Sequence, residues 1–274
     1  MTKLLLVGAG RMGAALLKGW LHALDESFSF VVLDPNVAKL QADLAGESRC
    51  TFCASARDLP GGAAVDGVVL ATKPQMLCDA LLQIAPQIGP QTIVISIAAG
   101  VETARIALAA QPATAIVRAM PNIGAMVGCS VTAAYAAAPT SLPQQALVEH
   151  LFAAIGIFSW VDAEADLHAV TALSGSGPAY YFALCEAMTA AAIDLGLNTM
   201  AARKLAAGTL AAAGLLIAKT PDPAALRQMV TSPNGTTAAG LAALGADDGL
   251  MRLSAQALAA AAKRSCELAR VSDG

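Results

Sequence analysis

The chain has 274 residues, which is enough for one large hydrophobic core or for two domains. Hydrophobic residues make up 56% of it and charged residues only 14%, and the formal net charge at pH 7 is -3. This balance argues against a nucleic-acid partner, because proteins that bind phosphate backbones usually carry a basic patch and this chain has no lysine-rich run.

The start of the chain predicts a strand, a glycine-rich turn and a helix. Residues 3–8 form a short apolar run, and a helical pattern follows at 11–24. No signal peptide is expected, because glycines and Arg11 follow the apolar run at once and no small-residue cleavage pattern is present. The GAGRMG motif between them has the spacing of a dinucleotide-binding turn. Gly8 permits the tight turn, Gly10 lets the backbone approach a pyrophosphate, and Gly13 lets helix and strand pack closely. The residues expected to bind the cofactor here are Gly8, Gly10, Arg11, Met12 and Gly13.

A second predicted strand ends at Asp34, and a helical pattern follows at 36–45. An acid at this place accepts hydrogen bonds from the adenosine ribose, which favours NADH. Asn36 and Lys39 follow within one helical turn, and either residue could meet the 2'-phosphate of NADPH. A turn or a helix cap before the following proline is the alternative role for Asp34. Both NADPH and NADH therefore stay open as the cofactor.

The CTFC segment at 50–53 has a spacing that is compatible with a metal or redox site. It lacks a second cysteine pair and a nearby histidine, and its alternation is typical of a β-strand, so no metal is expected. The six cysteines of the chain are scattered, which suits reduced thiols in a cytoplasmic protein.

Further strands are predicted at 65–72 and 92–98, with a helix between them at 75–85. Strands that alternate with helices imply a parallel sheet covered by helices on both faces, a Rossmann-type domain. Ligands of such sheets bind outside the carboxyl ends of the strands. The candidates at those ends for the nicotinamide side are Thr72, Lys73, Pro74, Ile97, Ala99, Met120, Pro121 and Asn122.

Three more strands are predicted at 115–121, 130–136 and 156–162, with a helix at 141–155. After Asp162 the pattern is helical throughout, so we expect an α/β dinucleotide-binding domain at 1–161 and an all-α domain at 162–274. The uncharged segments at 80–101 and 119–148 are long enough to span a membrane, but Pro, Gly, Gln or Asn interrupt both, and no membrane association is expected.

The helices predicted at 178–197, 200–219, 222–230 and 251–270 are rich in alanine and apolar on more than one face. Such helices need partners to bury their apolar faces. We therefore expect the helical domain to interlock with a second copy of itself.

The loop TSPNGTTAAGL at 231–241 holds hydroxyls, glycines and an amide, but no acid, base, histidine or thiol. Ser232 and Pro233 predict a helix start, which Gly235 could delay until Thr236. The unpaired N–H groups of a helix start attract a carboxylate for the same reason that they attract phosphate. The residues expected to bind a substrate carboxylate are Ser232, Gly235, Thr236 and Thr237.

Four segments together resemble the pyrroline-5-carboxylate reductases, namely VLATKPQ, RAMPN, ALSGSGPAYYF and TSPNGTTAAGL. The likeness covers nearly the whole chain in the same order. It implies a reductase that converts the small cyclic imine 1-pyrroline-5-carboxylate to L-proline with NADPH or NADH. It also implies a dinucleotide-binding domain followed by a helical dimerisation domain, and homodimers that assemble into larger rings.

The resemblance points to Thr237 as the hydroxyl nearest the ring nitrogen, and it places Glu164 where the family often has an acid that could meet the same nitrogen. An exposed glutamate at a helix start is the alternative role for Glu164. Thr237 lacks an activating neighbour in the sequence. It is therefore expected to orient the substrate as a hydrogen-bond donor or to relay a proton through water, rather than to act as a true acid. The chain departs from the family pattern in several places. They are Asn234-Gly235 in place of two glycines, Ile123-Gly124 in place of Thr-Pro, Gly245 in place of glutamate, and Gln228-Met229 before the loop.

Two rival functions stay open at this point. A β-hydroxyacid dehydrogenase needs a lysine on the first long helix of the second domain, and residues 178–197 contain none. A non-catalytic scaffold that senses NAD(P) would keep the same fold without turnover.

Overall fold

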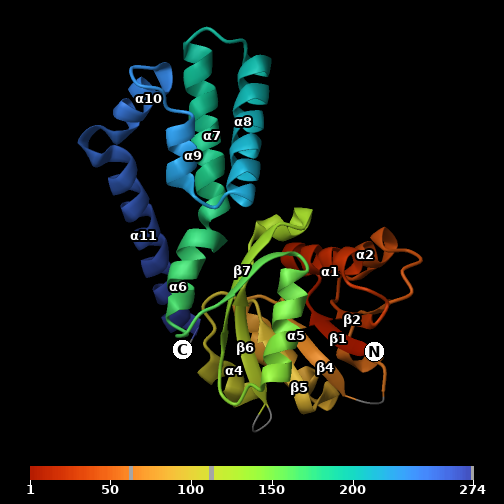
Figure 1. The fold of residues 1–274 in the computed structure, drawn as a ribbon. Helices are drawn as coiled ribbons and strands as arrows, with labels where there is room; N and C mark the ends of the chain where they lie inside the picture. Colours follow the sequence, from red (N-terminus) through yellow and green to blue (C-terminus); the bar gives the residue numbers. More distant parts are fainter. Residues whose placement is uncertain (62–63, 111–113, 273–274) are drawn as a thin grey trace. The chain divides into compact units, whose positions relative to one another are not determined.

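The computed structural model describes residues 1–61, 64–110 and 114–272, with side chains described as far as residue 270. It divides into two compact units. The first unit contains Met1–Gly175 and Ala261–Gly274, and the second contains Ser176–Ala260 (Figure 1). In the described residues, the first unit contains both strands and helices, and the second contains helices alone.

A mixed sheet of eight strands, counted over the described residues, forms the centre of the first unit. The strand order across the sheet is β3-β2-β1-β4-β5-β6-β7-β8. The strands are β1 (Thr2–Val7), β2 (Phe28–Leu33), β3 (Cys50–Cys53), β4 (Val65–Leu70), β5 (Ile88–Ser96), β6 (Ala115–Met120), β7 (Ser130–Ala136) and β8 (Gly156–Trp160). The first six strands run parallel to their neighbours, as the alternation of strands and helices predicts. β7 runs antiparallel to β6, and β8 runs parallel to β7; the sequence predicted these two strands but not their directions.

The chain order reverses between β1 and β4, where β2 and β3 lie on one side of β1 and the later strands lie on the other. Helices on both faces cover the sheet. They are α1 (Arg11–Ala23), α2 (Ala38–Asp43), α3 (Leu77–Gln83), α4 (Thr103–Ala109) and α5 (Leu142–Ala153). Such a reversal opens a crevice at the carboxyl ends of the strands, and that crevice is the usual ligand site of an open α/β sheet.

Two separate cores result from this layering. One core packs α1 and α5 against one face of the sheet through Trp20 and Phe152, and the other packs α3 and α4 against the opposite face through Leu77 and Ile106. Trp20 is fully buried, and its indole N–H donates to the carbonyl of Leu151 at 2.8 Å. This bond satisfies the polar atom of a large buried aromatic side chain and joins α1 to α5.

The first unit ends in α6 (Asp166–Val170) and a π-helical turn (Thr171–Gly175). The second unit consists of the helices α7 (Gly177–Asp194), α8 (Thr199–Lys219), α9 (Pro223–Met229), α10 (Thr236–Gly245) and the first part of α11 (Gly249–Ser272). The predicted change from strands to helices after the last strand is confirmed.

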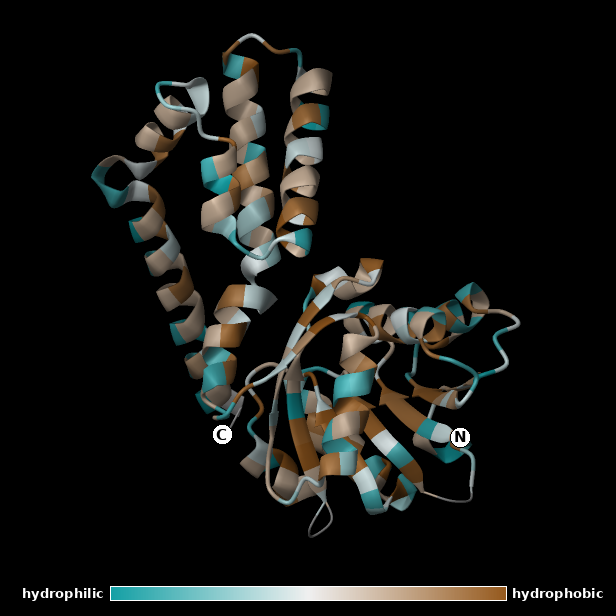
Figure 2. Cartoon of the chain, viewed as in Figure 1, coloured by the Kyte–Doolittle hydropathy of each residue, from teal (hydrophilic) through white to brown (hydrophobic). Residues whose placement is uncertain are grey.

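The helices of the second unit expose many apolar side chains. Tyr181 is 60% exposed, Leu215 is 68% exposed and Met200 is 80% exposed. Figure 2 shows apolar residues recurring along these helices, whereas in the first unit they concentrate on the strands of the sheet. By length and composition, α8 could cross a membrane, and among the described residues no other helix could; its mean hydropathy is 1.4 and it is almost entirely exposed.

Candidate active site

The glycine-rich turn between β1 and α1 has the geometry that its sequence predicts. Gly8 has φ of 101°, and a Cβ atom on it would lie 2.7 Å from the carbonyl oxygen of Ala71. A Cβ atom on Gly13 would lie 2.0 Å from the carbonyl oxygen of Gly8. Only glycine fits at these two positions. Gly10 is the N-cap of α1 and has open space around its Cα, so an anion can approach the helix N-terminus there.

Asp34 holds the glycine-rich turn in place. One of its carboxylate oxygens accepts a hydrogen bond from the backbone N–H of Ala9 at 2.7 Å, and the other accepts one from the backbone N–H of Asn36, also at 2.7 Å. Asp34 therefore acts as a turn residue that joins the β1–α1 and β2–α2 loops. Contact with a cofactor ribose stays a prediction for this residue.

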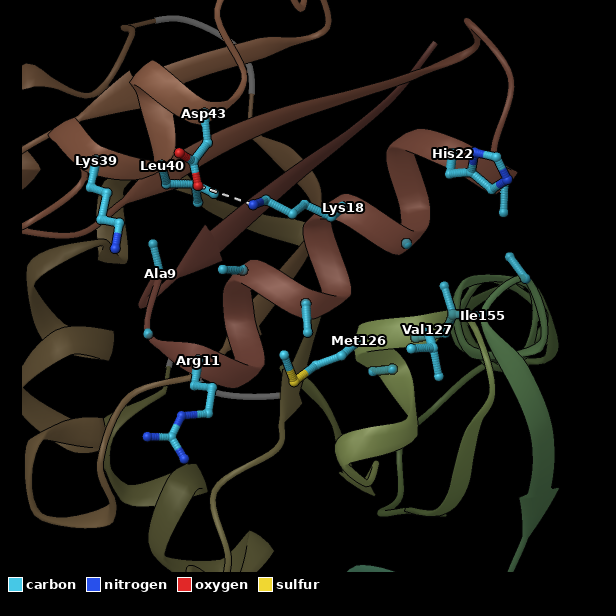
Figure 3. A pocket seen from close by; sticks show the side chains of 18 of the residues that line it. Ala9, Arg11, Lys18, His22, Lys39, Leu40, Asp43, Met126, Val127 and Ile155 are labelled. Carbon is cyan, nitrogen blue, oxygen red and sulfur yellow. Dashed lines mark hydrogen bonds and ion pairs between the residues drawn. The ribbon is translucent and has the colours of Figure 1, made fainter. Parts of the chain in front are cut away.

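A cavity of about 920 Å³ lies beside the same turn. Its polar lining includes Arg11, Asn36 and Lys39. Figure 3 shows Arg11 and Lys39 extending from α1 and α2 near Ala9, while Lys18 pairs with Asp43 at 3.1 Å further along α1. This end of the cavity is thus positively charged, which suits a phosphate group.

Thr72, directly beyond β4, carries a buried hydroxyl without a hydrogen-bond partner among the described residues. Burying a hydroxyl without a partner costs about 1–3 kcal/mol, so such an atom calls for an explanation. A ligand at the carboxyl end of β4 would supply the missing partner. Lys73 is exposed beside it, and Pro74 begins the short 3-10 helix that follows.

The carboxyl ends of β5 and β6 lie next to each other, because these strands are paired in parallel. Ile97 and Ala99, just beyond β5, are half-buried. Met120 ends β6 and is also half-buried, and Pro121 after it is buried. Met120, Ile97 and Ala99 are thus partly accessible at the edge of the sheet that carries the glycine-rich turn.

Asn122 is only 7% exposed, and its side chain makes three hydrogen bonds within the protein. Its Oδ1 accepts from the N–H of Gly124 at 3.0 Å and from the N–H of Val131 at 3.1 Å. Its Nδ2 donates to the carbonyl of Ser174 at 3.0 Å. The side chain that was expected to face the cofactor therefore connects three segments of the first unit.

Glu164 lies in a polar cluster with Thr103 and Arg118. One oxygen accepts from the backbone N–H of Thr103 at 2.7 Å and from Arg118 at 2.8 Å, and the other accepts from the Thr103 hydroxyl at 2.7 Å. Burial alone would raise the pKa of Glu164, but the hydrogen bonds from Arg118 and Thr103 outweigh it and hold that pKa below its usual value. The carboxylate is thus a charged anchor within the first unit, and a contact with the substrate nitrogen stays a prediction.

The 231–237 loop lies in the second unit and leads into α10. Asn234 has φ of 58°, so it adopts the left-handed conformation that glycine usually takes, and the N–H of Gly235 donates to the carbonyl of Ser232 at 3.1 Å. The helix begins at Thr236 with Gly235 as its N-cap, as the delayed start predicts. No side chain caps it.

The polar groups of this loop are free to meet a ligand. Among the residues that the structure describes, none hydrogen-bonds to the hydroxyl of Ser232, Thr236 or Thr237. The first N–H of α10 with a helical partner belongs to Ala239, which donates to Gly235 at 3.2 Å. The N-terminus of α10 therefore presents unpaired N–H groups beside three free hydroxyls.

The CTFC segment forms β3, as predicted. Burial, with the nearby charge of Glu47 as a second cause, raises the pKa of the Cys50 thiol to about 11, so the thiol is protonated at neutral pH. In the described part of the chain, no three His, Cys, Asp or Glu side chains come together as a metal site would require.

Sequence reasoning missed the partners of Glu164 and Asn122. Thr103, Arg118 and Ser174 are far from them along the chain, and no local pattern pairs such residues. One signal was available, because Arg118 is a charged residue inside the apolar run AIVRAM. An arginine in a buried strand needs a carboxylate partner.

Two family models match the chain. The model described as pyrroline-5-carboxylate reductase dimerisation matches residues 164–268. The model described as NADP oxidoreductase coenzyme F420-dependent matches residues 3–100.

Full-length relatives and solved structures agree with these models. The chain is 40% identical to the pyrroline-5-carboxylate reductase of Pseudomonas aeruginosa, covering 96% of this chain and 95% of the relative. It is 34% identical to that of Haemophilus influenzae, with 96% of each chain covered. The structure of the enzyme from Coxiella burnetii is similar with a TM-score of 0.87 and 33% identity, covering 97% of this chain and 98% of that one. The Plasmodium falciparum enzyme with NADP bound gives a TM-score of 0.79 at 25% identity, with 98% of each chain covered.

Proposed function

This chain belongs to the pyrroline-5-carboxylate reductase family, and from that premise we propose how its residues carry out the reaction. It reduces the cyclic imine 1-pyrroline-5-carboxylate to L-proline with NADPH or NADH as the reductant. Reduction of a carbon-nitrogen double bond by a hydride needs no protein nucleophile. The protein must bind the two reactants, orient them and accommodate the ring nitrogen as it becomes an amine.

The first unit binds the cofactor, which supplies the hydride when it is bound. The turn of Gly8, Gly10, Arg11, Met12 and Gly13 holds the pyrophosphate at the N-terminus of α1, where Gly10 leaves open space. The free hydroxyl of Thr72 supports a ligand at the carboxyl end of β4. We assign the nicotinamide side to Thr72, Lys73, Pro74, Ile97, Ala99, Met120 and Pro121.

Arg11, Asn36 and Lys39 favour NADPH over NADH. All three line the same cavity, and two of them carry positive charge, so a 2'-phosphate placed there gains charge-assisted hydrogen bonds. Asp34, the acid that would repel a phosphate, already accepts two backbone N–H groups.

The N-terminus of α10 binds the substrate carboxylate. The observation that carries this assignment is the set of unpaired N–H groups and free hydroxyls at Ser232, Gly235, Thr236 and Thr237. An anion there is stabilised both by hydrogen bonds and by the helix dipole. Thr237 orients the ring nitrogen or relays a proton to it through water.

The domain at 1–161 binds the nucleotide, and the domain at 162–274 binds the substrate and forms the dimer. The exposed apolar faces of α7 and α8 support burial against a second copy of the chain, and a model described as a dimerisation region covers them. We propose a cytoplasmic homodimer that assembles into a larger ring, with no nucleic-acid or membrane partner.

The test is the oxidation of NADPH and NADH by the purified protein, followed at 340 nm with and without 1-pyrroline-5-carboxylate. The expected result is oxidation that depends on the imine and proceeds with a higher kcat/KM for NADPH. A protein that binds NADPH but oxidises neither cofactor would instead be a scaffold that senses NAD(P).

A further inference from the structure

Asn122 is the residue from which the inference starts. It follows β6 at the edge of the sheet where the cofactor is assigned, and its amide has three partners on three segments. A buried primary amide has two donor hydrogens and one acceptor oxygen, so three bonds nearly exhaust it. The side chain has little capacity left for a ligand.

The donor side of Asn122 reaches the π-helical turn at 171–175, whose Ser174 carbonyl accepts from Nδ2 at 3.0 Å. This turn ends the first segment of the first unit at Gly175, and α7 begins two residues after it. A π-helical turn is an uncommon conformation that persists where tertiary contacts hold it, often at functional sites. The Asn122 bond is such a contact.

A second contact holds the same turn. A Cβ atom on Gly175 would lie 2.8 Å from the Cε of Met120, so the end of the turn packs directly on the end of β6. Met120 is one of the residues assigned above to the nicotinamide side. The π-helical turn therefore lies against the strand end that borders the cofactor.

The acceptor side of Asn122 depends on a departure of this chain from its family. Gly124 stands where the family often has proline, and its N–H donates to Oδ1 at 3.0 Å. Proline has no N–H to donate. The second bond to Oδ1 comes from the N–H of Val131 and joins Asn122 to β7, the strand antiparallel to β6.

We propose that Asn122 is a positioning residue for the reductase reaction, which acts by fixing the π-helical turn 171–175 against β6 rather than by touching the cofactor. The turn leads into one of the two chain connections between the unit assigned to the cofactor and the unit that carries the 231–237 loop; the other connection lies within α11. Loosening it is expected to slow turnover without weakening cofactor binding. Only the expected effect on kcat rests on the proposed function.

The variant Asn122→Asp tests the proposal sharply. It keeps an acceptor for Gly124 and Val131, removes the donor to Ser174 and adds a negative charge, so a carboxylate oxygen then faces the Ser174 carbonyl. Gly175→Ala disturbs the same turn from the Met120 side without changing any polar group. Thr92→Val is the matched control, because Thr92 is 2% exposed and its hydroxyl joins Gly89 to Val65 at the amino end of β5, away from the cofactor edge.

Both test variants are expected to lower kcat about tenfold, the effect of one lost interaction, with the NADPH Kd within about twofold of the unsubstituted protein. Hydrogen exchange of the amides of residues 171–179 is expected to accelerate in both variants and to stay unchanged in Thr92→Val. An unchanged kcat in both variants would overturn the proposal. An NADPH Kd that rises by the same factor as kcat falls would also overturn it, because Asn122 would then contact the cofactor.

Exchange and NADPH binding do not depend on turnover. If the unsubstituted protein reduces no imine, the proposed function fails, but hydrogen exchange still tests whether Asn122 holds the π-helical turn. Unchanged exchange at 171–179 in both variants would then refute it.

Discussion

Among single residues, hydroxyls and backbone groups rather than charged side chains are assigned to binding the substrate. The two acidic residues assigned to the sites, Asp34 and Glu164, have their carboxylate oxygens occupied by protein donors. The free groups are the hydroxyls of Ser232, Thr236 and Thr237 and the first N–H groups of α10. Such groups can bind an anion and orient a neutral ring.

Replacing Thr237 by alanine is expected to lower kcat by about ten- to a thousandfold, the effect of losing one well-placed hydrogen-bond donor. Steady-state kinetics with saturating NADPH measure this effect. Thr231→Val is the matched control, because the Thr231 hydroxyl donates to the carbonyl of Arg227 at 2.6 Å and faces the preceding helix instead. Unchanged turnover in Thr237→Ala would remove this hydroxyl from the mechanism.

Replacing Lys39 by glutamine is expected to raise the KM for NADPH about ten- to a hundredfold and to leave the KM for NADH unchanged, since only NADPH carries the 2'-phosphate. Kinetics with each cofactor separate the two effects. Lys18→Gln serves as the control, because Lys18 lines the same cavity but pairs with Asp43. Equal losses with both cofactors would place Lys39 away from the 2'-phosphate.

At the scale of elements, sequence reasoning succeeded where a local pattern determines the conformation. The GAGRMG spacing predicted the turn after β1, and the sequence before Thr236 predicted the delayed start of α10. The direction of β7 was missed, because an apolar run is compatible with either direction of a strand. Helix α4 was not among the predicted helices. The cluster of Thr103, Arg118 and Glu164 joins residues 46 and 61 positions apart, and only the fold brings them together.

That cluster ties the loop before α6 to β6 and to the start of α4, and its stability should depend on pH. The pKa of Glu164 is held below the usual value of 4.5, so the carboxylate stabilises the folded state above about pH 4.5 and loses this contribution as the pH falls through the folded-state pKa. Glu164→Gln is expected to cost about 1.5–3 kcal/mol at pH 7, the range for hydrogen bonds to charged groups.

Urea unfolding at several pH values measures this cost, and the difference between Glu164→Gln and the unsubstituted protein should shrink below pH 4.5. Glu267→Gln is the control, because Glu267 pairs with Arg264 at 2.9 Å on the surface and exposed pairs contribute little. A cost that stays constant down to pH 3 would show that the charge of Glu164 does not stabilise the fold.

At the scale of the whole molecule, the second unit leaves too much apolar surface exposed for a single chain. Large side chains on α7 and α8, such as Phe182 and Leu216, are more than half exposed. Monomeric proteins rarely expose contiguous apolar surface of this extent. We therefore expect light scattering coupled to gel filtration to give a mass of at least twice 27.5 kDa without detergent.

A charged substitution on the exposed apolar face of α8 tests the same self-association. Leu216→Glu buries a carboxylate if two chains pack here, so it should reduce the mass toward that of one chain. Lys219→Glu, at the end of the same helix, is the control and should leave the mass unchanged. A monomer in the unsubstituted protein, or recovery of it only in detergent, would contradict a self-associating face.

The most direct measurement of the central claim is a crystal structure with L-proline and NADP⁺ bound. We expect the proline carboxylate to accept hydrogen bonds from the backbone N–H groups at the start of α10, with the Thr237 hydroxyl facing the ring nitrogen. Proline bound away from residues 231–237, or its carboxylate paired with an arginine or lysine side chain, would contradict it.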